Sequence, residues 1–88
     1  MEEETIARVA AVLSEWNPLG ARAHAVIDLD GYRTEAIDMI MVLQLGGRSV
    51  APEETVRDVL NQAFDLTLKS DDCRAHAAKI QAIAKSAK

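Results

Sequence analysis

Residues 32–45 read YRTEAIDMIMVLQL, and this stretch decides the fold. Eight of the ten residues from 36 to 45 are apolar, and the next two are Gly46 and Gly47, which readily end a helix. A helix that is apolar on nearly every side is buried on most of them. We therefore expect residues 32–45 to form a helix that packs against several others.

The same stretch carries more apolar surface than a small domain can cover. Three other short helices would contact only part of it, and an exposed apolar patch usually marks an interface. Met39 and Met41 lie about 200° apart on a helix that turns about 100° per residue. One of them should lie in the core and the other near a partner. A second copy of the chain in a twofold dimer is the commonest such partner.

Three further segments have the spacing of amphipathic helices. Residues 3–16, 52–69 and 71–86 each place apolar side chains three and four residues apart, so that these share one face. Pro52 suits the first turn of its helix, and Ser70 is a good N-cap for the last one.

Residues 17–31 (NPLGARAHAVIDLDG) show no helical period. So long a loop in so small a domain is either functional or contains a short element, and Asp30 near its end could cap the next helix. The fold class that follows is all-α, a small bundle of about four helices with one long irregular loop. Residues 1–88 form a single domain.

Composition and charge exclude several classes of function. The 88 residues are 49% hydrophobic, and the net charge of −4 comes without the clustered basic face that nucleic-acid binding needs. The one cysteine, Cys73, cannot form an intramolecular disulfide, and no signal peptide is recognisable. No apolar run approaches the roughly 20 residues of a membrane span. We expect a cytoplasmic protein that binds neither nucleic acid nor membrane.

Two aspartates come nearest to a catalytic motif. Residues 26–31 read VIDLDG, which is similar to the D-x-D-G-T nucleophile loop of haloacid-dehalogenase-like phosphatases. Tyr32 stands where that family has threonine, and one candidate strand cannot build the parallel sheet that holds such a loop. We favour a helix-capping acidic loop. A Mg²⁺-dependent phosphatase-like hydrolase acting through Asp28 and Asp30 is the alternative.

Other catalytic and metal sites find less support. A calcium loop would place Val26 and Ile37 at positions that require oxygen ligands. Cys73 and His76 lie three residues apart on one helix, but two ligands do not make a structural zinc site. We interpret Cys73 as a small core residue rather than a nucleophile. The expectation is therefore a protein without enzymatic activity, cofactor or metal.

A set of short motifs along the chain has the pattern of a known family. Residues 16–20 read WNPLG after an amphipathic segment, Tyr32 and residues 35–36 (EA) precede the apolar helix, and residues 72–74 (DCR) open the last one. With these motifs the chain resembles the YugE-like proteins, small bacterial helical proteins with a W-[ND]-P-x-G signature. That resemblance implies no known activity. Similar openings in small immunity-type proteins suggest a role in neutralising a toxin.

The WNPLG segment is interpreted first as a structural corner. Exposed Trp and Tyr are also favoured anchors at interfaces, so the segment is a candidate contact surface. We predict a non-enzymatic protein–protein interaction module, immunity- or regulator-like, that can self-associate; a purely structural homodimer is a further alternative. The candidate partner-binding residues are Trp16, Pro18, Leu19, Tyr32, Met39 and Met41.

Overall fold

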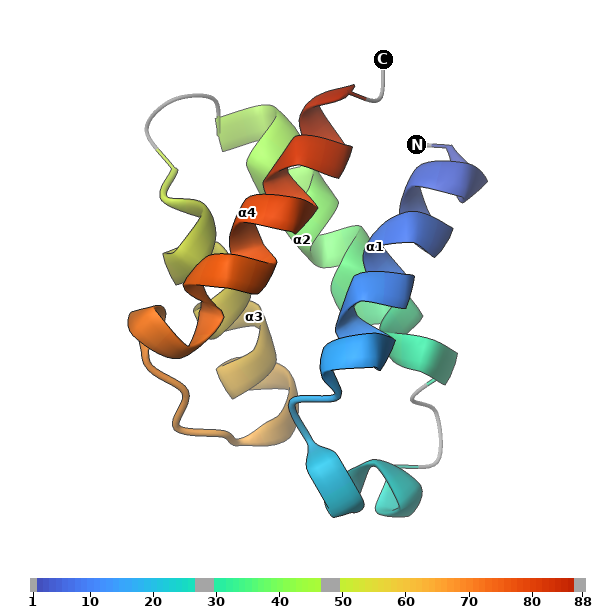
Figure 1. Cartoon of the computed structure of the whole chain (residues 1–88), viewed down its shortest axis with the longest axis vertical. Helices are drawn as coiled ribbons and strands as arrows, with labels where there is room; N and C mark the ends of the chain where they lie inside the picture. Colours follow the sequence, from blue (N-terminus) through green and yellow to red (C-terminus); the bar gives the residue numbers. More distant parts are fainter. Residues whose placement is uncertain (1, 27–29, 47–49, 87–88) are drawn as a thin grey trace.

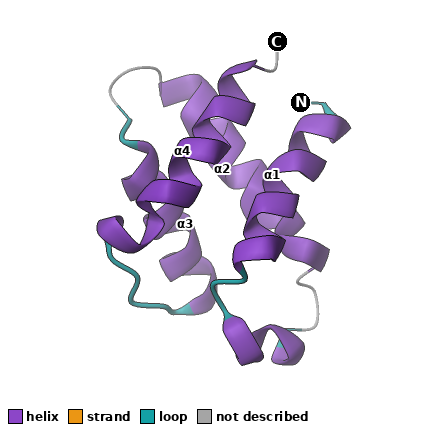
Figure 2. Ribbon diagram, in the orientation of Figure 1, coloured by secondary structure: helices purple, strands orange, loops and turns teal. Residues whose placement is uncertain are grey.

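The computed structural model describes residues 2–26, 30–46 and 50–86. In these residues the chain forms α-helices and short 3₁₀-helices and no strand (Figures 1 and 2). The predicted fold class, a small all-α bundle of about four helices, is confirmed. The elements in chain order are α1 (Glu3–Trp16), η1 (Gly20–Ala25), η2 (Asp30–Tyr32), α2 (Arg33–Gly46), α3 (Pro52–Phe64) and α4 (Ser70–Ser86).

Consecutive α-helices run in opposite directions, so both ends of the chain lie at one end of the bundle (Figure 1). Helices α2 and α4 each contact the three other α-helices, whereas α1 and α3 share no contact among the described residues. The pair α2 and α4 is therefore central, with α1 on one side of it and α3 on the other. This arrangement leaves the outer face of α2 without a covering helix.

The core lies along the central pair of helices. Small side chains of α4 are fully buried there, and the Gln44 side chain of α2 donates a hydrogen bond to the Ala84 carbonyl at 3.1 Å. Helices α1 and α3 add branched side chains from both sides. The buried apolar residues are Ile6, Val9, Leu13, Leu19, Tyr32, Ala36, Met39, Ile40, Leu43, Val56, Leu60, Cys73, Ala77, Ile80 and Ala84.

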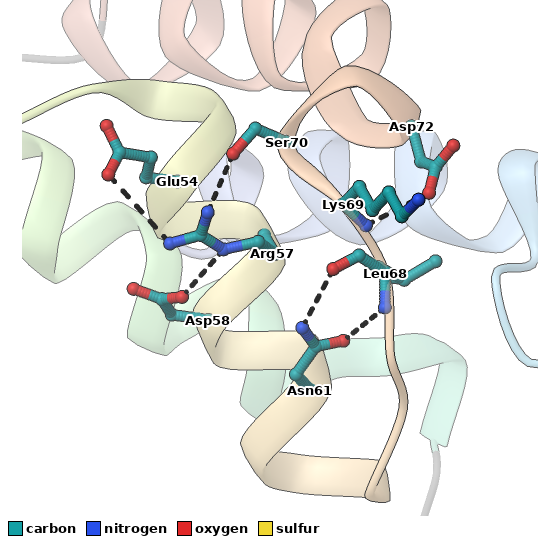
Figure 3. A network of polar contacts seen from close by, with 8 residues as sticks. All are labelled: Glu54, Arg57, Asp58, Asn61, Leu68, Lys69, Ser70 and Asp72. Atoms are coloured by element: carbon teal, nitrogen blue, oxygen red, sulfur yellow. Dashed lines mark hydrogen bonds and ion pairs between the residues drawn. The ribbon is translucent and has the colours of Figure 1, made fainter.

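The predicted helix over residues 52–69 was too long, because the structure ends α3 at Phe64. Asp65 turns the chain with a left-handed φ of 54°. The Asn61 side chain then donates to the Leu68 carbonyl at 3.1 Å and accepts from the Leu68 amide at 2.9 Å (Figure 3). One amide thus satisfies both backbone groups of a residue that periodicity assigned to the helix.

Ser70 opens α4, but it does not cap that helix as the sequence predicted. Its hydroxyl instead accepts a hydrogen bond from Arg57 of α3 at 2.7 Å. The capping contact comes from Asp72, whose carboxylate accepts from the Lys69 backbone amide at 2.9 Å (Figure 3). A carboxylate on the third residue of a helix that accepts from the backbone amide just before the helix is half of a capping box.

The expected irregular loop over residues 17–31 contains two short 3₁₀-helices, η1 and η2. Asp30 does not adjoin α2 as a cap; it begins η2. Asp30, Gly31 and Tyr32 have successive φ angles of 44°, 62° and 65°. A left-handed conformation costs a residue other than glycine about 1–2 kcal/mol. The burial of the Tyr32 side chain, which is 2% exposed, offsets this cost.

Candidate functional site

The structure separates the six predicted partner-binding residues into three groups. Leu19, Tyr32 and Met39 are buried in the core, so these three are not part of an exposed contact surface. Trp16 and Pro18 are half-buried. Met41 is 46% exposed. The expectation that one of the two methionines lies inside and the other outside is confirmed, with Met39 as the inner residue.

Leu19 and Tyr32 are buried because they build the corner after α1. The Tyr32 hydroxyl donates to the Asn17 side-chain oxygen at 2.8 Å and accepts from the Leu19 backbone amide at 3.3 Å. Burial raises the pKa of Tyr32 above its ordinary value. The WNPLG segment and Tyr32 thus form one structural unit. Sequence reasoning named both parts but missed Asn17 as the partner that joins them.

Trp16 is held at the seam between α1 and α4. Its ring stacks on the His76 ring with centroids 4.3 Å apart and planes 7° from parallel. The pair borders a shallow hollow of about 200 Å³ that Val12, Glu15 and Lys79 also line. One face of Trp16 is therefore occupied within the chain. This contact leaves less of Trp16 for a partner than the sequence led us to expect.

His76 lies in this seam with one ring nitrogen sealed off. Its Nδ1 atom is buried and has no hydrogen-bond partner in the structure. Burial lowers the pKa of His76; the positive charge of Lys79 lowers it further, and the negative charge of Glu15 opposes both. The imidazole is thus kept neutral more strongly than an exposed histidine, which suits packing against an aromatic ring.

The outer face of α2 carries the largest exposed apolar side chains in the described part of the protein. Met41 is 46% exposed, Val42 42% and Leu45 83%. At about 100° per residue, Leu45 points about 180° away from Ala36, which is fully buried. Sequence reasoning expected either Met39 or Met41 on this face, without choosing between them, and did not name Val42 or Leu45. Counting about 100° per residue from the buried residues of α2 places both of these side chains on the outer face.

A hollow of about 440 Å³ lies next to these side chains, between α2 and α3. Its wall on α2 consists of Asp38, Met41 and Val42. Its wall on α3 consists of Val59, Gln62 and Ala63. We call Met41, Val42 and Leu45 together with this hollow the α2 surface. It combines exposed apolar side chains with an adjacent depression, which are the features of a protein-docking surface.

The side chains that the sequence offered as catalytic groups or metal ligands are not assembled into a site within the described residues. Asp28 lies outside the described residues, and Asp30 is the exposed first residue of η2. Cys73 is fully buried, and burial raises the pKa of its thiol, so a reactive thiolate is disfavoured. Among residues 2–26, 30–46 and 50–86, no three His, Cys, Asp or Glu side chains gather as metal ligands would. In the same ranges, every helix is too short or too polar to cross a membrane.

Comparison of the chain with protein families, curated proteins and solved structures finds no match. The resemblance to the YugE-like proteins therefore stays a prediction. The function has to be argued from the α2 surface and the residues around it.

Proposed function

We propose that this protein is a non-enzymatic protein–protein interaction module that binds through the α2 surface. The observation that carries the proposal is the exposure of Met41, Val42 and Leu45 on one helix. Apolar side chains that are grouped on one surface mark an interface more often than scattered ones do, and burying them against a partner contributes about 25 cal/mol per Å². A central helix that keeps such side chains outside is best explained by a contact that covers them.

The chemistry of the remaining residues supports a binding role over a hydrolytic one. A phosphatase-like site needs two aspartates after a strand of a parallel sheet. The described residues form no strand, and Asp30 lies on a 3₁₀-turn. The immunity- or regulator-like role and the membership in the YugE-like family that the sequence suggested are finer forms of the same proposal.

Site-specific photo-cross-linking in cells of the source organism tests the proposal. A benzophenone amino acid is placed at position 45, the most exposed apolar residue of the α2 surface. The matched control carries it at position 11, where Ala11 is exposed on α1. We expect a discrete adduct of higher mass from position 45 and none from position 11. The Met41→Glu change, made in the position-45 protein, should abolish the adduct.

The mass of the adduct distinguishes the two kinds of contact. An adduct of twice the mass of the chain supports the self-associating form of the proposal, and an adduct that contains another polypeptide supports a heterologous partner. If position 45 gives no more adduct than position 11, the α2 surface has no protein partner and the proposal is wrong.

A further inference from the structure

Asp38 is the one charged residue among the described residues that line the hollow of the α2 surface. Asp38 lines the hollow, and no ion pair to it occurs within the described residues. Both arginines of α2 and α3 are already engaged, because Arg33 pairs with Glu3 of α1 and Arg57 pairs with Asp58 and Glu54. None of the described residues that line the hollow is basic.

Further exposed carboxylates continue along the α3 side. Asp58 is one helical turn before Gln62, so that its carboxylate lies beside a residue of the hollow wall, and exposed Asp65 follows the end of α3. Arg57 offsets part of this charge, and Arg22 approaches the end of α3 by donating to the Phe64 carbonyl. The carboxylate within the hollow itself, that of Asp38, has no such compensation.

The shape of the surface fits a helix. Helices α2 and α3 run antiparallel (Figure 1). The hollow between them is open to solvent and is lined mainly by apolar side chains, those of Met41, Val42, Val59 and Ala63. An amphipathic helix lies in an apolar groove through apolar residues at steps of three and four. Met41 is unbranched and adapts to the side chains that it meets.

A second copy of the chain is a poorer match by charge. A twofold contact would place the same surface against itself. The described residues of that surface would bring no cation to Asp38 and would bring a second Asp38 into the interface. A partner that carries lysine or arginine next to its apolar stripe would instead complement the acidic side of the hollow.

We propose that the α2 surface binds an amphipathic helix of another protein whose apolar stripe is flanked by basic residues. Leucine-like side chains of that helix enter the hollow and contact Met41, Val42 and Leu45, and its basic side chains lie along Asp38. This inference rests on the proposed function and adds the chemistry of the partner.

Fluorescence anisotropy with synthetic peptides tests the inference. The probe is a labelled amphipathic peptide about 18 residues long, or five turns, with a leucine stripe flanked by lysines. Two control peptides have the same length. One replaces every lysine with glutamate, and the other scrambles the lysine–leucine sequence so that no stripe forms. Each is titrated with the wild-type protein, Met41→Glu and Asp38→Lys, at about 0.05 M and about 0.5 M salt.

We expect the lysine peptide to bind at least about tenfold more tightly than either control, a difference of about 1.4 kcal/mol. Met41→Glu should weaken its binding about tenfold or more, whereas Asp38→Lys should remove the preference for lysine over glutamate. Equal binding of the scrambled peptide overturns the inference, because it indicates a general attraction of positive charge. Equal binding of the glutamate peptide overturns it as well.

Failure of this inference is distinguishable from failure of the proposed function. No peptide binding together with a cross-linked adduct from position 45 means that the α2 surface binds a partner of different chemistry. If the adduct contains two copies of this chain, the occupant is a second copy and the basic helix is excluded. Absence of both signals overturns the two proposals together.

Discussion

The hydroxyl of Tyr32 donates a hydrogen bond to the side-chain oxygen of Asn17 at 2.8 Å, across the corner that joins α1 to α2. Asn17 holds a left-handed φ of 51° and Tyr32 one of 65°. Two strained residues are thus tied to each other, and the Leu19 amide adds a second bond to the same hydroxyl. The corner is held by the side chain of a residue fifteen positions further along the chain.

Removing this hydroxyl should destabilise the fold. Tyr32→Phe keeps the buried ring but leaves the Leu19 amide and the Asn17 side chain without their partner. We expect a loss of about 1–3 kcal/mol in the free energy of unfolding, measured by urea denaturation. Asn17→Gly, which retains the left-handed backbone, is the second arm of a double-mutant cycle. A coupling below about 0.5 kcal/mol between the two changes would show that the bond contributes little.

Stability should fall on mild acidification because of His76. The folded pKa of this residue lies below its ordinary value of 6.5, so the unfolded chain binds the proton first as the pH falls. The fold therefore loses stability as the pH drops below about 6.5. His76→Phe keeps a ring against Trp16 and should remove this part of the pH dependence. The check is the thermal midpoint of both proteins between about pH 7.5 and pH 5.5; parallel curves would contradict the prediction.

Glu35 should make the stability of the fold depend on pH in the direction opposite to His76. The Glu35 side chain is buried, and this desolvation raises the pKa of its carboxyl. A backbone hydrogen bond lowers that pKa, and the negative charge of nearby Asp38 raises it. The folded state then binds the proton more readily than the unfolded chain, whose carboxyl has a pKa near 4.5. The stability that this carboxyl contributes to the wild-type fold is present below about pH 4.5. It is lost as the pH rises through the higher pKa of the folded state.

Glu35→Gln should therefore stabilise the protein at pH 7 and lose this advantage toward pH 4.5. Thermal denaturation across that range measures the difference. Glu4→Gln, at an exposed position of α1, is the control and should change little. A Glu35→Gln protein that is less stable than wild type at pH 7 would show that the carboxylate makes contacts that outweigh its burial.

Gly46 should not tolerate a methyl group. A Cβ atom built there would overlap a methyl carbon of Val50 and lie 3.0 Å from its Cβ. Gly46→Ala should lower the free energy of unfolding by about 1–3 kcal/mol, the range for overpacking, although alanine is the better helix former. Val50→Ala removes the obstructing methyls and should restore part of the loss in the double variant. Two strictly additive losses would mean that the clash is relieved elsewhere.

Met39 in the core and Met41 on the outer face should differ in how much a charged substitution destabilises the fold. Met39→Glu places a carboxylate in the core and should unfold the chain, since an unpaired buried charge costs several kcal/mol or more. Met41→Glu places the same group at a 46% exposed position and should change stability by less than about 0.5 kcal/mol. Circular dichroism with denaturant measures both. If the Met41→Glu protein unfolds, Met41 is part of the structural core and not of the binding surface.

Hydrophobic periodicity predicted most of the architecture because the helices obey it closely. The first helix was predicted at residues 3–16 and found there, and the two methionines of α2 were assigned correctly to opposite faces. The errors occur where single polar side chains override periodicity. Asn61 ends α3 early by bonding Leu68, a contact that no repeat in the sequence signals.

The candidate site was harder to predict than the fold. Tyr32 was named as a candidate contact residue because exposed Trp and Tyr are favoured anchors at interfaces. Its burial depends on a left-handed turn and on a bond to Asn17, which only the folded chain brings together. Leu45 is the most exposed of the large apolar residues described, and it was missed because the apolar run of α2 has almost no polar face to orient it.

Cys73 is the one thiol in the chain, and its side chain is fully enclosed between the helices. An alkylating reagent can reach it only when α4 separates from its neighbours. The rate at which Cys73 is alkylated therefore depends on how readily the helix bundle opens. Alkylation of Cys73 thus measures opening of the bundle, and a partner that binds the α2 surface of the closed form should slow that alkylation.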